Sequence, residues 1–199
     1  DYLTHQNSKN GTPTMGGVLI MLAMTVSTLL WGDLGNPYMW LLLATGLSFS
    51  VIGLADDYCK IKKLWHNGVP AKIRLALMWL IGFVVIALAV MINPQPDDTM
   101  LYLPFIKQAA VEIGLIGLLL IGGFVMVGSA NAVNITDGLD GLVSMPAVIV
   151  ALTLAVLAYV VGRVDYTEYL AISHVPNAGE ITVVLSALVG AILAFLWYN

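Results

Sequence analysis

Two adjacent carboxylates, Asp56 and Asp57, stand at the end of a long apolar stretch. Neighbouring carboxylates repel each other, and the C-terminal end of a helix disfavours an anion by about 0.3–1 kcal/mol. A divalent cation or a proton-transfer role would compensate this arrangement, although nearby lysines could do so without any function. Carboxylates beside lysines suit phosphate chemistry with Mg²⁺, which binds one or two carboxylates together with phosphate oxygens. The pair is a candidate catalytic site and a candidate Mg²⁺ site.

A second motif repeats amides and carboxylates at every third residue. Its members are Asn131, Asn134, Asp137 and Asp140. On a helix, side chains three residues apart are neighbours, so adjacent members can converge on one ligand. A calcium loop of the EF-hand type would need a different spacing and a terminal glutamate. The motif is therefore a candidate substrate-binding segment rather than a plain polar turn.

A third motif, Lys9-Asn-Gly-Thr-Pro-Thr-Met-Gly-Gly17, precedes the first apolar stretch. Thr12 or Thr14 can cap the helix that follows, and Gly16 and Gly17 allow backbone amides to approach a ligand closely. A helix N-terminus with free amides and a nearby lysine can hold a phosphate. A capped helix start with a lysine of no catalytic role explains the same residues, so both interpretations stay open at this point.

The rest of the sequence predicts the elements that position these motifs. Of the 199 residues, 59% are hydrophobic and 10% are charged, whereas a soluble domain carries roughly 25% charged residues. A chain this apolar needs lipid as its solvent. In lipid the backbone N–H and C=O groups must form their hydrogen bonds within the segment, as they do in a helix. Stretches near the roughly 17–25 residues that cross a bilayer lie at about 15–31, 38–55, 73–92, 111–127, 142–161 and 181–198. We expect one all-α, polytopic membrane domain over residues 1–199 with six transmembrane helices.

Basic residues are distributed unevenly over the two sides of these spans. The side with the three motifs carries Lys9, Lys60, Lys62, Lys63, Lys72 and Arg74, and the other side carries Lys107 and Arg163. The positive-inside rule makes the first side cytoplasmic. All three motifs therefore face the cytoplasm.

Composition and motif placement also separate classes of function. The net charge of −4 offers no basic stripe for a nucleic acid, and the single Cys59 excludes an intrachain disulfide. An ion-coupled transporter would place acids near the middle of its spans. The carboxylates gather instead at one side, so we favour an enzyme and keep the transporter as an alternative.

The motifs together resemble a known family, the phospho-N-acetylmuramoyl-pentapeptide transferases. Gly11–Gly17, Asp56-Asp57-Tyr58 and Asn131–Gly141 match its motifs in order, and Phe195–Asn199 resembles its next signature. The resemblance implies a ten-helix enzyme of the bacterial cytoplasmic (inner) membrane, usually a homodimer, of which this chain would be a fragment truncated at both ends. Such an enzyme transfers phospho-MurNAc-pentapeptide from its UDP form to undecaprenyl phosphate with the help of Mg²⁺. The products are UMP and lipid I, in the first membrane step of peptidoglycan synthesis.

The resemblance also implies roles for single residues. Asp56 and Asp57 belong to its catalytic centre, where either could deprotonate the lipid phosphate or help to hold the metal. Lys9 and Lys72 correspond to lysines that face the nucleotide and its phosphates. Further substrate-binding candidates are Asn131, Asn134, Asp137, Asp140 and Asn199. The family's main Mg²⁺ ligand would follow Asn199, so Asp56 and Asp57 would form only part of a metal site.

The nearest alternative is a polyprenyl-phosphate GlcNAc-1-phosphate transferase, which would differ in the sugar nucleotide that it uses. Those relatives resemble this chain mainly at the acidic motifs. The Gly-Thr-Pro-Thr-Met-Gly-Gly segment at Gly11–Gly17 favours the MurNAc-pentapeptide enzymes.

Overall fold

The fold is a bundle of long helices, as the hydropathy predicts. The computed structural model describes residues 16–62, 68–92, 94, 99–102, 110–136 and 142–198. Its long helices are α2 (Gly16–Trp31), α3 (Pro37–Ile61), α4 (Ala71–Ile92), α5 (Gly114–Thr136), α6 (Ser144–Val161) and α8 (Ile181–Tyr198). Five of them are long and apolar enough to cross a membrane, and the sixth, α2, is apolar with 16 residues. The chain is thus an all-α, multi-pass membrane protein.

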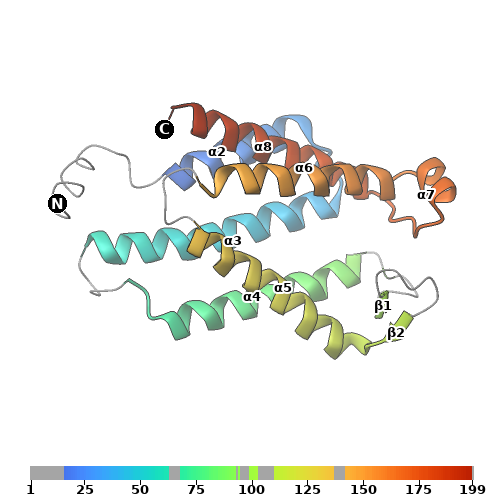
Figure 1. The fold of residues 1–199 in the computed structure, drawn as a ribbon, viewed down its shortest axis with the longest axis horizontal. Helices are drawn as coiled ribbons and strands as arrows, with labels where there is room; N and C mark the ends of the chain where they lie inside the picture. Colours follow the sequence, from blue (N-terminus) through green and yellow to red (C-terminus); the bar gives the residue numbers. More distant parts are fainter. Residues whose placement is uncertain are drawn as a thin grey trace.

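The helices lie side by side in two groups that α3 connects (Figure 1). Helix α8 packs on both α2 and α6, while α4 packs on α5 and α3. Small buried clusters join these helices. One consists of Met24, Met39, Leu43 and Val184, another of Val148, Ala151, Val189 and Ile192, and a third of Ile52, Met78 and Val127. The third cluster fastens α3 to α4 and α5, and these three helices carry the polar residues of the candidate site.

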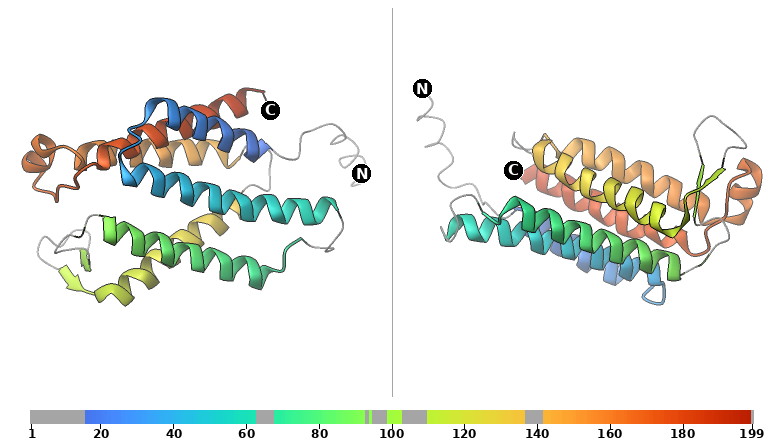
Figure 2. Two further views of the ribbon diagram at one scale, coloured as in Figure 1. Left: turned by 180° about the vertical axis from the view of Figure 1, so that it is seen from behind. Right: turned by 90° about the horizontal axis from the view of Figure 1, so that it is seen from below.

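Successive spans run in opposite directions, so the polar motifs meet at one end of the bundle. The start of α2 and the ends of α3, α5 and α8 lie toward the left in Figure 1, together with the starts of α4 and α6. The views in Figure 2 show the same separation of the two ends. At the opposite end lie a two-stranded antiparallel sheet, β1 (Met100–Tyr102) and β2 (Ala110–Glu112), and two short helices, α7 (Val164–Leu170) and the 3₁₀ helix η1 (Ala178–Glu180).

Two helices extend beyond the ends that hydropathy predicts. Helix α3 continues to Ile61 rather than stopping near residue 55, so Asp56 and Asp57 lie within its last turns. Helix α5 begins at Gly114 and continues to Thr136 rather than stopping near residue 127. Hydropathy marks where the sequence becomes polar, whereas a helix continues as long as its backbone hydrogen bonds do. A helix can therefore carry polar side chains beyond its apolar part.

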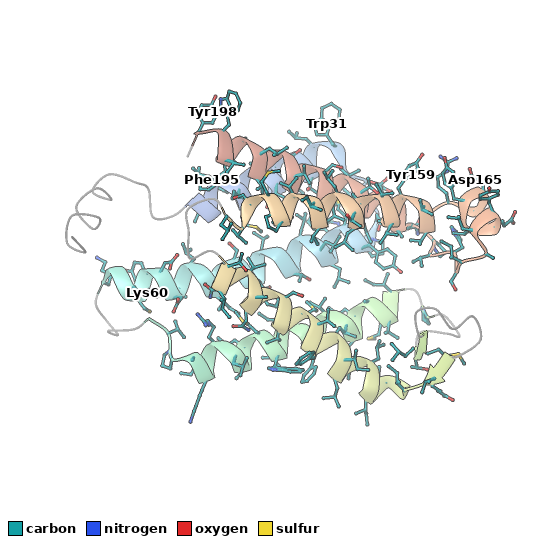
Figure 3. The ribbon with its side chains drawn as sticks, in the orientation of Figure 1. Trp31, Lys60, Tyr159, Asp165, Phe195 and Tyr198 are labelled. Carbon is teal, nitrogen blue, oxygen red and sulfur yellow. The ribbon has the colours of Figure 1, made fainter. Side chains whose placement is uncertain are left out.

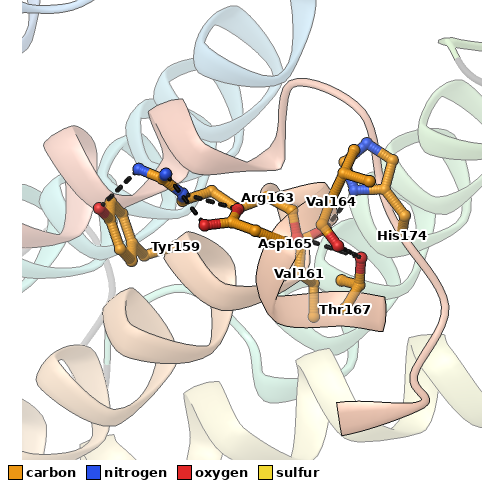
Figure 4. A network of polar contacts seen from close by, with 7 residues as sticks. All are labelled: Tyr159, Val161, Arg163, Val164, Asp165, Thr167 and His174. Atoms are coloured by element: carbon orange, nitrogen blue, oxygen red, sulfur yellow. Dashed lines mark hydrogen bonds and ion pairs between the residues drawn. The ribbon is translucent and has the colours of Figure 1, made fainter. Parts of the chain in front are cut away.

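The opposite end of the bundle is held by a cluster around Arg163 (Figure 4). The guanidinium lies 5.6 Å from the ring centre of Tyr159 and 5.4 Å from that of Tyr166. It donates two hydrogen bonds of 3.1 Å to the Asp165 carboxylate, and these keep the pKa of that carboxyl below its usual value. His174 Nδ1 lies 3.0 Å from a backbone carbonyl oxygen at the end of α6. These contacts fix α7 and the segment after it against α6.

The orientation in the membrane can be tested with two exposed positions at opposite ends of the bundle. Lys62 follows the end of α3, and Tyr169 lies on α7. In full-length protein carrying Cys59→Ala, we expect an impermeant thiol reagent to label Tyr169→Cys in intact cells and to leave Lys62→Cys unlabelled. The physical reason is the excess of basic residues on the Lys62 side. Labelling of Lys62→Cys in intact cells, with Tyr169→Cys protected, would reverse the orientation and place the acidic pair outside.

Candidate active site

A cleft of about 660 Å³ opens between α3, α4 and α5. Its polar lining is Thr45, Asp56, Asp57, Lys60, Arg74, Ser129 and Asn134. Its apolar lining includes Phe49, Ile52, Met78, Met126 and Val133. The charged groups lie at the end of α3 and the start of α4, whereas Ile52, Met78 and Met126 lie farther along their helices. The cleft can therefore receive a molecule that is charged at one end and apolar at the other.

Asp56 is the buried member of the acidic pair. Its side chain is 8% exposed, and Oδ2 lies 2.5 Å from Lys60 Nζ and 3.8 Å from Arg74 Nη1. The other oxygen, Oδ1, accepts a hydrogen bond of 2.8 Å from the backbone N–H of Val69. Asp56 thus joins the end of α3, the start of α4 and the segment just before α4.

Gly68 allows this segment to pass close to Asp56. Its φ is +75°, a conformation that side chains rarely adopt. A Cβ at this position would collide with Asp56 Oδ1 and would lie 2.9 Å from Lys60 Cε. The backbone therefore approaches the carboxylate because residue 68 has no side chain.

Asp57 is the accessible member of the pair. Its side chain is 50% exposed, and the charged partner near it is Lys60, whose Nζ lies 3.7 Å from Oδ1. The same ammonium is closer to Asp56, so it neutralises Asp57 less. Figure 3 shows Lys60 near the end of α3, and its side chain is about half exposed. Asp57 therefore presents a carboxylate to whatever occupies the cleft.

A second groove, of about 400 Å³, runs between α2 and α3 and also ends at Asp57. Gly17 lines this groove, and a Cβ added to Gly17 would meet no atom within 4 Å. The adjacent Gly16 faces the Phe195 ring, which a Cβ would strike. Gly16 thus serves close helix packing, whereas Gly17 borders open space beside the acidic pair. The structure brings the last glycine of the third motif to Asp57.

The two asparagines of α5 have different surroundings. Asn134 is exposed and lines the cleft. Asn131 turns inward, where its Nδ2 donates a hydrogen bond of 2.8 Å to the carbonyl oxygen of Val127 and lies 3.7 Å from the Met78 sulfur. Asn134 is placed to contact a ligand in the cleft, whereas Asn131 supports the contact between α5 and α4.

The other predicted site residues lie apart from this cleft or outside the described residues. Lys72 is exposed in the first turn of α4 and does not line the cleft. Lys9, Asp137, Asp140 and Asn199 lie outside the part of the chain that the structure describes. Their predicted roles stay predictions.

The structure adds two cations that the sequence analysis did not select, Lys60 and Arg74. For Lys60 a signal existed, since it stands four residues after Asp56 and so faces it on a helix. For Arg74 no comparable signal existed, because it belongs to the next helix and meets Asp56 only through tertiary packing.

The acidic pair is compatible with a Mg²⁺ site that substrate phosphates complete. Within the described residues, no group of three or more histidine, cysteine, aspartate or glutamate side chains is gathered around one point. Mg²⁺ usually binds through one or two carboxylates together with phosphate oxygens. Asp57, with Asp56 beside it, meets this requirement.

Comparisons with known proteins identify the family of this chain. The family described as glycosyl transferase family 4 matches residues 39–199, and the phospho-N-acetylmuramoyl-pentapeptide-transferase signature 1 matches residues 9–21. The chain is 50% identical over 192 residues to the phospho-N-acetylmuramoyl-pentapeptide-transferase of Ruegeria pomeroyi. These 192 residues cover 96% of this chain and 53% of that protein. It is 47% identical over 196 residues to the protein of the same name from Dinoroseobacter shibae, covering 98% of this chain and 54% of the relative. The chain thus spans about half the length of these curated relatives.

Proposed function

We propose, since this chain belongs to glycosyl transferase family 4, that it carries part of the active site of a phosphoglycosyl transferase of the bacterial inner membrane. The enzyme transfers phospho-MurNAc-pentapeptide from its UDP form to undecaprenyl phosphate and makes lipid I and UMP. The observation that carries the proposal is the cleft that combines Asp56, Asp57, Lys60 and Arg74 with an apolar wall. Its substrates would be a nucleotide-linked diphosphate and a lipid phosphate, and its polar end would face the cytoplasm.

The reaction that we propose is a phosphoryl transfer. An oxygen of the acceptor phosphate attacks the phosphorus that carries the sugar, the P–O bond to UMP breaks, and UMP leaves with that electron pair. A proton on the acceptor phosphate passes to a carboxylate. Asp57 is accessible for this proton, whereas Asp56 becomes available only when Lys60 turns from it to a substrate phosphate.

Mg²⁺, when bound, would neutralise charge on the diphosphate. Asp57 and Asp56 would hold it within this chain. Lys60, Arg74 and Asn134 would orient the substrate oxygens from the walls of the cleft. We further propose that Lys9 faces the diphosphate and that Lys72, which does not line the cleft, reaches it from the exposed side of the first turn of α4. In this proposal Asp137 and Asp140 face the nucleotide, and the enzyme works as a homodimer.

The choice of donor distinguishes this proposal from its nearest alternative. Purified full-length enzyme with undecaprenyl phosphate and Mg²⁺ should release UMP from UDP-MurNAc-pentapeptide and should release little or none from UDP-GlcNAc. The match of residues 9–21 to a signature of MurNAc-pentapeptide transferases supports this expectation. The test measures UMP released when both donors are offered together. Preference for UDP-GlcNAc would assign the chain to the sibling activity, and no UMP from either donor would contradict the transferase proposal.

A further inference from the structure

Arg74 lies where the charged part of the cleft meets its mainly apolar part. It lies in the first turn of α4, and Met78, the next residue of α4 that lines the cleft, is one turn farther along and buried. Across from this boundary, α3 contributes Ile52 and α5 contributes Met126. If the anionic group of a ligand bound at Arg74, the part of the ligand next to that group would therefore contact apolar side chains.

The guanidinium is oriented by Asp56 without being fully occupied by it. Its Nη1 lies 3.8 Å from Asp56 Oδ2, which is too long for a hydrogen bond. Lys60 Nζ, at 2.5 Å, is the closer partner of that oxygen. An arginine carries five N–H donors in a planar fork that fits two oxygens of a phosphate. With its side chain 26% exposed, Arg74 can present part of this fork to the cleft.

We propose that Arg74 is the positioning residue that binds the phosphate of the lipid acceptor, with the start of the prenyl chain lying along Ile52, Met78 and Met126. The inference rests on the proposed function and adds the place of one substrate. The donor is polar along its nucleotide, sugar and peptide, so an apolar wall next to its phosphates would leave polar groups desolvated. A prenyl phosphate has its single anionic group at one end of a hydrocarbon chain, as the cleft requires.

The first test compares Arg74→Gln, Arg74→Lys and the control Lys62→Gln in full-length enzyme. Lys62 is exposed at the end of α3 and does not line the cleft, so its replacement removes one positive charge from the same end of the bundle. We expect Arg74→Gln to raise the KM for undecaprenyl phosphate at least about tenfold, the low end for hydrogen bonds to charged groups. The KM for the UDP donor should change less than about twofold. The KM of Arg74→Lys for undecaprenyl phosphate should lie between those of Arg74→Gln and Lys62→Gln, because lysine keeps the charge and loses the planar fork of N–H donors.

A binding measurement makes the test independent of turnover. Farnesyl phosphate should bind detergent-solubilised Arg74→Gln at least about tenfold more weakly than wild type, while farnesol should bind both equally. Met126→Gln keeps Arg74. It should weaken the binding of farnesyl phosphate more than the binding of geranyl phosphate, because the longer prenyl chain contacts more of the apolar wall of the cleft. This variant also serves if Arg74→Gln unfolds, which the thermal midpoint would reveal.

Several outcomes would overturn the inference. A raised KM for the UDP donor with an unchanged acceptor KM would make Arg74 a donor-binding residue. Equal binding of farnesyl phosphate to wild type and Arg74→Gln would contradict the binding of the lipid acceptor in this cleft. The same conclusion would follow if Met126→Gln weakened the binding of farnesyl phosphate and geranyl phosphate equally. If wild-type enzyme bound farnesyl phosphate through Arg74 but released no UMP from either donor, the proposed reaction would fail while the lipid-phosphate site would stand.

Discussion

Replacing Asp57 with asparagine in the full-length enzyme should lower Mg²⁺-dependent UMP release by at least about a hundredfold, the low end for loss of a general base. Asparagine keeps the size of the side chain and removes both the proton-accepting oxygen and the negative charge that a metal requires. Asp57 is half-exposed, and Lys60 is its nearby charged partner at 3.7 Å, so folding should be little affected. Initial rates of UMP release, together with the thermal midpoint, measure both effects.

Asp33→Asn is a matched control for this substitution. Asp33 is exposed at the opposite end of the bundle, and its Oδ1 accepts a hydrogen bond from the N–H of Gly35, which an asparagine oxygen can also accept. It should leave UMP release unchanged.

Asp56→Asn should differ from Asp57→Asn in its effect on stability. It removes the anion that pairs with Lys60 on α3 and with Arg74 on α4, so both UMP release and the thermal midpoint should fall. Normal turnover in both Asp56→Asn and Asp57→Asn would reduce the acidic pair to a solvated part of α3 and would contradict its catalytic role.

Gly68→Ala should lower UMP release at least about tenfold although the residue bears no functional group. Adopting a left-handed conformation costs an L-residue roughly 1–2 kcal/mol, and φ at Gly68 is +75°. The added methyl would also push against Asp56 Oδ1 and Lys60 Cε. Since the strain can be relieved by moving the Asp56 carboxylate, the effect should appear in turnover as well as in the thermal midpoint.

Gly128→Ala is the control for a general effect of replacing glycine. Gly128 lies within α5, and an added Cβ would meet no atom within 4 Å. Alanine is the better helix former by up to about 1 kcal/mol, so this variant should be as active and as stable as wild type, or more stable. Full activity of Gly68→Ala would show that the segment before α4 can shift without disturbing Asp56.

Much of the architecture follows from the sequence because lipid leaves few alternatives. A backbone within a bilayer must satisfy its own hydrogen bonds, so each long apolar stretch predicts a helix. Each of the six predicted spans contains one long helix, although the span predicted from residue 111 begins in β2. The positions of their polar ends were less predictable. Hydropathy detects the apolar part of a helix, whereas α3 continues to Ile61 and α5 to Thr136 through polar sequence. The short α7 and strand β1 lie in segments where hydropathy predicts no element, and β2 occupies the first residues of the span predicted from residue 111.

The sequence by itself determined which residue types are suited to the chemistry, because the acidic pair and the repeated amides stand out from an apolar chain. The tertiary structure decided which of them share a cleft. It placed Arg74 beside Asp56 and left Lys72 exposed, although the two cations are two residues apart on α4. It also distinguished the buried Asp56 from the accessible Asp57. Side chains of neighbouring residues on a helix point about 100° apart, so the packing of α3 against α4 decides which side chain is buried and which stays exposed.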